Sequence, residues 1–216
     1  NPMLKFYHAP WSRSSSILWL LEELEADYEL IHIDIRAESG VPEDYRSIQP
    51  NKKVPAIEHE GVIITERAAI SIYLADRFSK ARLAPSLDAL ERGPYLTMTA
   101  YLSAVLDPCI TMRAQGLSYS SNDHAFGTFD DMVTYLERIL QQRPYAAGGA
   151  FTAADIQLAS SIEFTMNVIK VLPHRAAFAD YLERIGERPA LTRARRLDAE
   201  LAATVPALQK LMPQLN

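Results

Sequence analysis

The chain has 216 residues, a formal net charge of −5 and a hydrophobic fraction of 48%. The negative charge argues against a nucleic-acid-binding protein, which usually presents a basic face, and no uncharged apolar run approaches the length of a membrane span. The single cysteine, Cys109, excludes an internal disulfide, and the start NPMLKFYHAP lacks a signal-peptide pattern, so we expect a cytoplasmic protein.

The first eighty residues are expected to alternate between strands and helices. Apolar and aromatic runs with period two predict strands, and Ile17, Leu18, Leu21 and Leu24 recur at helical spacing. Such alternation favours a parallel pair with a crossover, and a hairpin adds antiparallel strands. We therefore expect a mixed four-stranded sheet with helices on its faces. The expected elements are a strand over 3–8, a helix over 14–25, a strand over 28–35, one helical turn within 42–48, two strands within 54–65 joined at Glu60-Gly61, and a helix over 66–78.

Beyond residue 80 only helical periodicity is found, so no strand is expected there. One long helix is predicted from about Asp88 to Gly116, disturbed by Pro108, and a second from about Asp123 to Gln142. Further helices are expected over 151–169 and, as one or two pieces, within 174–194. The third of these helices opens with FTAADIQ, in which Thr152 and Asp155 have the spacing of a capping box.

The segment KKVPAI is a candidate binding feature. Pro55 opens a strand, where its missing N–H does no harm, and X–Pro bonds adopt the cis form at modest cost. We expect a cis Val54–Pro55 bond, which would turn the backbone N–H and C=O of Val54 outward. A bound peptide could then pair with Val54 as an extra edge strand. A strand-initiating proline without a binding role is an equally good interpretation.

The segment TERAAI is a second candidate. Thr65 is the expected N-cap of a helix, with Glu66 and Arg67 in its first turn. Free N–H groups at a helix N-terminus favour a carboxylate, and Glu66 could accept a ligand's ammonium group, so the pair suits the amino-acid end of a zwitterion. The alternative is an acidic first turn that only complements the helix dipole.

A third candidate is the serine cluster before the first helix, which we expect beside Val54 and Glu66 at the carboxyl ends of the parallel strands. A thiolate bound there would gain from the helix dipole and from a hydroxyl donor. The alternative is capping by Ser12 or Ser14, and four serines exceed what either role requires. The cluster consists of Ser12, Arg13, Ser14, Ser15 and Ser16.

The chain resembles the cytosolic glutathione transferases, and most closely their bacterial and fungal branch with serine-type sites. The resemblance rests on YHAPWSRSSSILWLLEEL, KKVPAI, ERAAISIYLADRF, FTAADIQLA and YLERIGERPALTRA, whose order and spacing cover nearly the whole chain. It implies an α/β plus all-α fold: a thioredoxin-like glutathione-binding domain over 3–79, a linker over 80–87, and an all-helical domain over 88–216 that contributes the electrophile site.

The resemblance also implies roles for the candidate residues. Val54 and Pro55 would hold the cysteinyl backbone of glutathione, and Glu66 and Arg67 its γ-glutamyl end, with Lys53 near the glycyl carboxylate. The expected glutathione-binding residues are Arg13, Lys53, Val54, Pro55, Glu66 and Arg67.

Two departures from the family pattern affect these roles. A serine usually follows the acidic residue, whereas this chain has Arg67, which could replace the serine as a bidentate partner or block the site. Trp11 falls where several classes keep their catalytic Ser or Cys. The catalytic candidates are therefore Ser12 and, second, Ser14, and we expect Ser12 to donate to the sulfur while Ser14, with help from Ser15, caps the helix.

The resemblance implies a detoxifying transferase that adds the glutathione thiolate to an apolar electrophile, acts as a homodimer and needs no metal. Its partners would be glutathione and the small electrophile, with no nucleic acid and no membrane. Alternatives are a glutathione-dependent peroxidase or disulfide reductase, and a non-catalytic binding module. Cys109 is expected to be a buried packing residue. The electrophile site is expected near Tyr101, Val105, Met112 and Arg113.

Overall fold

The computed structural model describes residues 3–211, and their contacts divide them into two units. The first, here called the sheet unit, contains residues 3–81 together with 187–211. The second, the helical unit, contains residues 82–186. The domain expected over 88–216 therefore differs from the observed grouping, because the last helices join the sheet unit.

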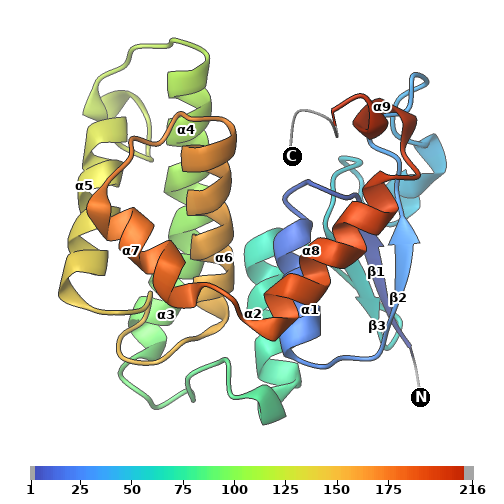
Figure 1. Ribbon diagram of the computed structural model, residues 1–216, viewed down its shortest axis with the longest axis horizontal. Helices are drawn as coiled ribbons and strands as arrows, with labels where there is room; N and C mark the ends of the chain where they lie inside the picture. The colour runs from blue at the N-terminus through green and yellow to red at the C-terminus, as the bar shows by residue number, and fades with distance from the viewer. Residues whose placement is uncertain (1–2, 212–216) are drawn as a thin grey trace. The chain divides into compact units, whose positions relative to one another are not determined.

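The sheet has the order β2-β1-β3-β4, which confirms the predicted mixed four-stranded sheet (Figure 1). β1 pairs parallel with β2, while β3 is antiparallel to both β1 and β4. The predicted hairpin is present, and Glu60 and Gly61 both adopt positive φ in its two-residue turn, as such turns require. The strands are β1 (Leu4–His8), β2 (Tyr28–His32), β3 (Ala56–His59) and β4 (Val62–Thr65).

Four helices belong to the sheet unit. The first is shorter than predicted, because Glu25 takes a φ of 51° and the N–H of Ala26 returns to the carbonyl of Leu21 at 3.1 Å, which ends the helix. Its apolar face is fully buried at Ile17, Leu18, Leu20 and Leu21. The helices are α1 (Ser15–Glu23), α2 (Arg67–Arg77), α8 (Pro189–Ala202) and α9 (Pro206–Gln209), with short 3-10 turns at Glu43–Ser47 and Ser79–Ala81.

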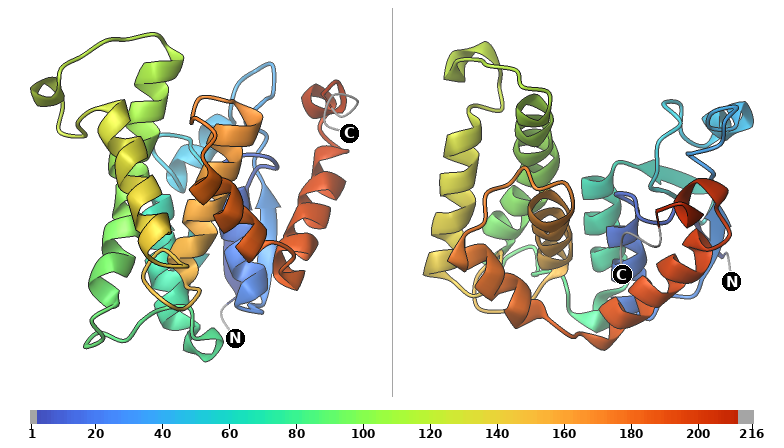
Figure 2. Two further views of the ribbon diagram at one scale, coloured as in Figure 1. Left: turned by 60° about the vertical axis from the view of Figure 1, so that its left-hand side comes forward. Right: turned by 45° about the horizontal axis from the view of Figure 1, so that its top comes forward.

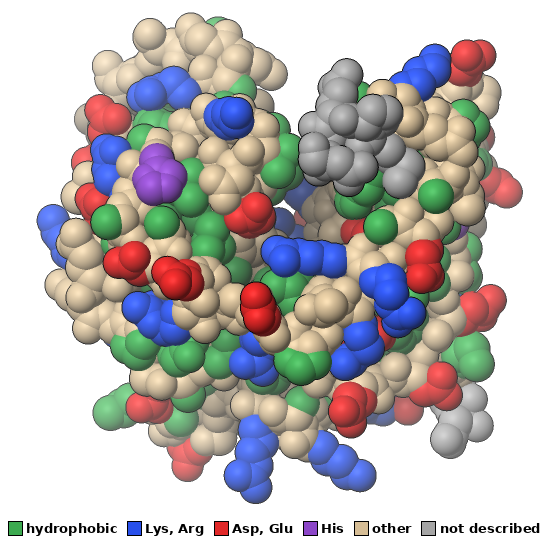
Figure 3. All heavy atoms as spheres, in the orientation of Figure 1, with side chains coloured by type: hydrophobic (Ala, Val, Ile, Leu, Met, Phe, Trp, Pro, Cys, Tyr) green, Lys and Arg blue, Asp and Glu red, His purple; other side chains and the backbone are tan. Residues whose placement is uncertain are grey.

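α8 lies along α1, which explains why the end of the chain joins the sheet unit (Figures 1 and 2). The buried residues of α8 recur every fourth position, and they are Ala190, Ala194, Asp198 and Ala202. Small side chains allow two helices to approach closely. We call this set the α8 stripe. Basic side chains gather over the other faces of α8 (Figure 3), which carry the exposed Arg195 and Arg196.

The helical unit contains no strand among its described residues. Its elements are α3 (Arg92–Tyr101), a π-helical turn (Leu102–Leu106), α4 (Asp107–Ala114), a 3-10 turn (Ser121–Asp123), α5 (Phe129–Gln142), α6 (Ala153–Ile162), a second π-helical turn (Glu163–Val168) and α7 (Ala176–Ile185).

The long helix predicted from Asp88 begins only at Arg92 and changes pitch before Pro108. Proline has no N–H to offer the carbonyl four residues earlier, and the chain widens into a π-helical turn at Leu102–Leu106 without leaving the helical path (Figure 2). The next helix begins at Phe129 instead of Asp123, because Asp123 closes its own turn by accepting the N–H of Ser120 at 2.7 Å.

The capping box predicted at α6 is confirmed and extends into the core of the helical unit. Asp155 accepts the N–H of Thr152 at 2.9 Å, the N–H of Ala146 at 2.8 Å and the hydroxyl of Tyr181 at 2.6 Å. Cys109 is fully buried, as predicted, and burial raises the pKa of its thiol. These residues therefore serve the packing of the helical unit.

Candidate functional site

The register of the sheet brings the candidate segments to one edge. Tyr7 pairs with Ala56 and Ala56 pairs with Thr65, so the end of β1, the start of β3 and the end of β4 lie side by side. The loop into α1 follows β1, the Val54–Pro55 segment directly precedes β3, and Glu66 directly follows β4. The three candidate features thus converge, as the sequence predicts.

The Val54–Pro55 peptide bond is cis, as predicted. Among residues 3–211, neither the N–H nor the C=O of Val54 is hydrogen-bonded. Tyr45 anchors the segment: it is buried and donates its hydroxyl to the carbonyl of Lys53 at 2.8 Å. Val54 therefore offers a free donor and acceptor on an anchored backbone, while the side chain of Lys53 is exposed.

The N-cap of α2 is Glu66 and not Thr65, which corrects the sequence-based assignment. Thr65 is held in β4 by its pairing with Ala56, so it cannot turn to cap the helix. Glu66 makes the turn itself with a φ of 71°, a conformation that costs a non-glycine residue free energy and that clusters at functional sites. Its side chain is exposed and makes no capping hydrogen bond, and Arg67 is the first residue of α2.

Trp11 belongs to the β1–α1 loop, and its side chain packs against the C-terminal helices of the sheet unit. It has a φ of 55°, and its ring packs against Ala202, Val205 and Leu208 at the end of α8 and in α9. Arg36 donates to the carbonyl of Trp11 at 3.4 Å and to that of the preceding proline at 3.3 Å. The loop that presents the serines is thus fixed from two sides.

Ser12 and Ser14 differ sharply in exposure. Ser14 is fully buried, and its hydroxyl lies 2.6 Å from His8 Nδ1 and 2.7 Å from the hydroxyl of Ser12. Ser14 is the N-cap residue of α1, as predicted, but its side chain makes no capping hydrogen bond and contacts His8 of β1 instead. Ser12 is half-buried, and its hydroxyl lies 2.7 Å from the carbonyl of Ala9. Of the two candidates, only Ser12 is accessible to a ligand.

Sequence reasoning missed two residues behind the serines, His8 and Asp198. His8 is fully buried, and its Nε2 lies 2.6 Å from Asp198 Oδ1. The other carboxylate oxygen of Asp198 accepts the N–H of Trp11 at 3.3 Å and the hydroxyl of Ser15. Asp198 is the one charged member of the α8 stripe, and a carboxylate at a buried helical position needs partners. The helical spacing could therefore have indicated that Asp198 is buried and hydrogen-bonded, but it could not identify its partners.

The predicted electrophile residues all belong to the helical unit. The ring of Tyr101 lies 4.4 Å from that of Tyr135, and burial raises the pKa of the Tyr101 hydroxyl. The guanidinium of Arg113 lies 3.8 Å from the centre of the Phe129 ring. Val105 and Met112 are half-buried.

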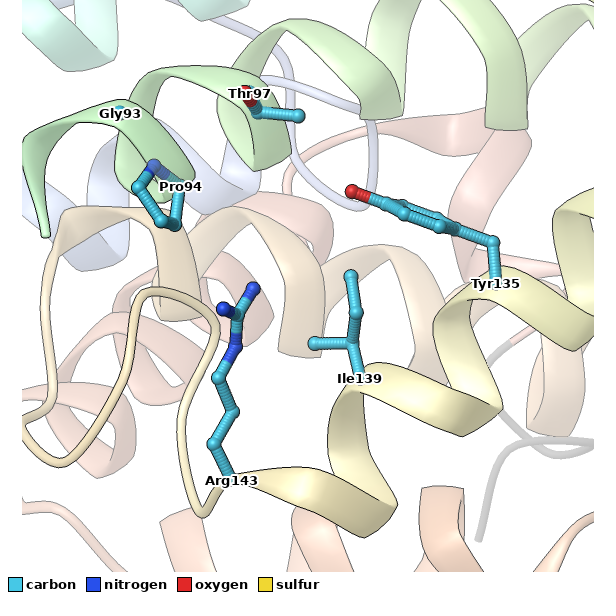
Figure 4. Close-up of a pocket in the computed structure, with 6 residues that line it drawn as sticks. All are labelled: Gly93, Pro94, Thr97, Tyr135, Ile139 and Arg143. Atoms are coloured by element: carbon cyan, nitrogen blue, oxygen red, sulfur yellow. The ribbon is translucent and has the colours of Figure 1, made fainter.

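A groove of about 410 Å³ opens between α3 and α5 of the helical unit (Figure 4). Arg143 extends its guanidinium into the groove beside Ile139 (Figure 4), and its Nε is buried with no hydrogen-bond partner among residues 3–211. None of the predicted electrophile residues lines it, although Tyr135 connects it to Tyr101. The lining residues are Gly93, Pro94, Thr97, Tyr135, Ile139 and Arg143.

Family comparisons agree with this geometry. The models of the glutathione S-transferase N-terminal and C-terminal domains match residues 2–76 and 118–193, which together make up more than half of the chain. The chain belongs to the glutathione S-transferase family. Its N-terminal match contains the serine loop, the cis proline segment and the start of α2.

Individual glutathione transferases and relatives show the same similarity. Glutathione S-transferase 3 of Schizosaccharomyces pombe is 28% identical over 174 residues, 72% of each chain. The disulfide-bond oxidoreductase YfcG of Escherichia coli is 27% identical over 206 residues, covering 89% of this chain and 94% of YfcG. A sphingomonad glutathione S-transferase, solved in complex with glutathione, has a TM-score of 0.73 at 27% identity, covering 90% of this chain and 98% of its own.

The described part of this family member holds no group of three or more His, Cys, Asp or Glu side chains placed to bind a metal. His59 of the hairpin is buried, and its Nδ1 lies 2.8 Å from the hydroxyl of Tyr73. No helix within residues 3–211 is long and apolar enough to cross a membrane.

Proposed function

We propose that this protein is a serine-type glutathione transferase: it binds glutathione at the edge of the sheet unit, ionises the thiol and transfers the sulfur to an apolar electrophile. Membership of the family and the similarity to a glutathione-bound relative support this proposal. The observation that carries it is the accessible hydroxyl of Ser12 at the entrance to α1, on the sheet edge that also presents Val54 and Glu66.

Each part of glutathione has a chemically suitable counterpart. The unpaired N–H and C=O of Val54 suit the cysteinyl backbone, which would add to them as an extended strand does. The carboxylate of Glu66 suits the γ-glutamyl ammonium group. The amides of α2 and the guanidinium of Arg67 suit its carboxylate. Lys53 and Arg13 are both exposed. We assign Lys53 to the glycyl carboxylate of glutathione and Arg13 to the rim of the site.

The thiol requires a modest stabilisation of its ionised form. A free thiol has a pKa of about 8.5, and lowering it to about 6.5 takes roughly 2.7 kcal/mol of preferential thiolate stabilisation. One charge-assisted hydrogen bond from Ser12 together with the α1 terminus is sufficient for that amount. Ser14 cannot play this role without unfolding the loop, because it is fully buried.

The remaining assignments follow the family. Tyr101, Val105, Met112 and Arg113 would contribute to the electrophile site, and the thioredoxin-like domain over 3–79 would supply glutathione. We expect a homodimer that works in the cytoplasm and detoxifies electrophiles.

A second candidate is a glutathione-dependent disulfide reductase. The observation that favours it is the similarity to the disulfide-bond oxidoreductase YfcG, which extends over 89% of the chain. The same thiolate would then attack a disulfide in place of an electrophilic carbon. A peroxidase would use it on a peroxide, and a non-catalytic module would bind glutathione without turnover.

Binding and turnover assays separate these functions. We expect retention on immobilised glutathione, conjugation of an aromatic halide, and weaker activity on a small disulfide and on a peroxide. Faster reduction of the disulfide than conjugation would favour the reductase. Binding without any turnover would leave a binding module, and failure to bind glutathione would overturn the proposal.

A further inference from the structure

Four polar side chains form one hydrogen-bonded row beneath the β1–α1 loop. Asp198 Oδ1 lies 2.6 Å from His8 Nε2, His8 Nδ1 lies 2.6 Å from Ser14 Oγ, and Ser14 Oγ lies 2.7 Å from Ser12 Oγ. His8 and Ser14 are fully buried and Asp198 is 5% exposed, while Ser12 is half-buried. The row therefore leads from a buried carboxylate to the hydroxyl that we assign to the thiol.

In the Ser12–Ser14 contact either hydroxyl can donate, and one pattern of protons has both hydroxyls donate toward His8. A carboxylate only accepts, so Nε2 of a neutral His8 carries the proton and donates it to Asp198, and Nδ1 accepts the hydroxyl of Ser14. Ser14 Oγ then accepts the N–H of Ala9 at 3.2 Å and the hydroxyl of Ser12. Ser12 Oγ accepts the N–H of Ser14 at 3.1 Å and keeps one lone pair for a ligand.

A second complete pattern is reached when Ser12 receives one proton from the ligand and the hydroxyl protons of Ser12 and Ser14 each move one step toward His8. Both nitrogens of His8 then donate, one to Asp198 and the other to Ser14. Ser14 donates to Ser12, and Ser12 turns its proton outward to the ligand. The carbonyl of Ala9 lies 2.7 Å from Ser12 Oγ and 3.1 Å from Ser14 Oγ, so it is a competing acceptor for the two hydroxyl protons. The two patterns differ in what Ser12 offers: an acceptor for a thiol in the first, a donor for a thiolate in the second.

We propose that Asp198, His8 and Ser14 form a proton relay in which His8 is the final acceptor of the glutathione thiol proton. The inference rests on the proposed function. The S–H bond breaks and its proton passes to Ser12 Oγ, the proton of Ser12 passes to Ser14 Oγ, and that of Ser14 passes to His8 Nδ1. Sulfur keeps the electron pair and accepts a hydrogen bond from Ser12. After sulfur transfer the proton leaves by the same path to solvent.

The relay has suitable electrostatic surroundings. Asp198 contacts the imidazole at 2.6 Å and orients it, as a third group orients a histidine base. His32 is the partner of His8 in the strand register, and burial lowers the pKa of His32. Further charged or titratable side chains near the relay are Asp34, Tyr28, Glu22, Arg193 and Arg36.

Proton release on glutathione binding tests the relay directly. The experiment titrates the protein with glutathione in weak buffer, follows the thiolate by its ultraviolet absorbance and follows released protons with a pH indicator. If His8 retains the proton, clearly fewer protons are released than thiolates are formed. Release of one proton for every thiolate would overturn the relay.

Two variants interrupt the row at different points. Ser14→Ala leaves the buried Asp198–His8 pair intact, and Asp198→Asn keeps the shape but favours the opposite tautomer of His8. We expect either variant to form the thiolate only at higher pH and to lose turnover roughly 10- to 100-fold at neutral pH, with the KM for glutathione little changed. Turnover and proton release equal to those of the parent protein in Ser14→Ala would contradict the relay.

Glu23→Gln is the matched control. Glu23 accepts three hydrogen bonds from Arg188, at 2.9, 3.1 and 2.9 Å, and so also ties α1 to the segment that opens α8, without touching the relay. A general loosening of α8 would lower the thermal stability of Glu23→Gln and Asp198→Asn alike, whereas the pH dependence of thiolate formation should change only in Asp198→Asn. An equal change of that pH dependence in both variants would overturn the relay.

The tautomer of His8 in the ligand-free protein gives a test that does not depend on glutathione. Long-range ¹H–¹⁵N NMR spectra should show the Nε2–H form. An Nδ1–H form would overturn the relay and leave the proposed function standing, whereas absence of glutathione binding would remove the proposed function and the relay together.

Discussion

The two serine hydroxyls beside the β1–α1 loop lie 2.7 Å apart, yet their surroundings assign them different tasks. Ser12 is half-buried, whereas Ser14 is fully buried and enclosed by His8, Ala9 and Ser12. Sequence alone could not separate them, because both precede the same helix and both suit a cap. Tertiary contacts with β1 and α8 decide the difference.

Replacing Ser12 tests its role at the sulfur. Ser12→Ala should lower turnover at neutral pH by roughly 10- to 100-fold, the scale of one lost charge-assisted hydrogen bond. The deficit should shrink as pH rises, because the thiol then ionises unaided. Ser12→Thr keeps the hydroxyl and should recover most of the activity. Full activity of Ser12→Ala in a steady-state assay at neutral pH would contradict the assignment.

Arg67 departs from the family pattern, and we expect it to hold the γ-glutamyl carboxylate. Arg67→Ser should raise the Kd for glutathione about 5- to 20-fold, because a charged donor is replaced by a neutral hydroxyl. Isothermal titration calorimetry at low and high salt measures the effect, and the difference between the proteins should narrow in high salt. Tighter binding by the serine variant would show that Arg67 blocks the site.

At the scale of elements, α8 is the strongest link between distant parts of the sequence in the sheet unit. The α8 stripe packs on α1, and Asp198 reaches the loop before that helix through His8, Trp11 and Ser15. The same helix therefore stabilises the unit and holds the β1–α1 loop in place.

Removing the carboxylate of Asp198 should be costly. Asp198→Ala leaves His8, the Trp11 amide and Ser15 without their acceptor, so the free energy of unfolding should fall by about 3–5 kcal/mol. Ser15→Ala, which removes only one donor to the same carboxylate, should cost about 1 kcal/mol. Urea denaturation measures both. Similar losses in the two variants would show that Asp198 is not the centre of the network.

Helix caps in the helical unit offer a comparison between a buried and a more exposed threonine. Thr152 is 6% exposed and shares Asp155 with the core, whereas Thr128 is half-buried and accepts only the N–H of Asp131 at 3.2 Å. Thr128→Ala should cost about 1 kcal/mol and Thr152→Ala up to about 2 kcal/mol. Thermal unfolding should show a larger loss of stability for Thr152→Ala than for Thr128→Ala. A larger loss for Thr128→Ala would contradict the role given to the Thr152–Asp155 capping box.

Local patterns predicted most elements, and tertiary contacts account for the rest. Period-two and helical spacing located β1, the hairpin and α2 within a few residues, and the capping box located the start of α6. The convergence of the candidate segments was predictable, because the directions of the strands determine which strand ends lie at the same edge of the sheet. Glu66 as the cap and Asp198 as a partner of His8 depend on register and on long-range packing, which no window of sequence contains.

At the scale of the whole molecule, we expect two copies of the 24.2 kDa chain to associate. Apolar side chains that assembly would cover include Val62 on β4, 59% exposed, and Leu96 on α3, 37% exposed. Light scattering at micromolar concentration should give twice the mass of the chain. A stable single-chain mass across the concentration range would contradict the homodimer.

The central claim is that glutathione binds at the edge of the sheet unit with its sulfur at Ser12. A crystal structure of the complex tests it most directly. We predict sulfur within hydrogen-bond distance of Ser12 Oγ, the cysteinyl backbone paired with Val54, and the γ-glutamyl carboxylate at Arg67. Glutathione bound elsewhere, or bound with its sulfur turned away from Ser12, would contradict the account.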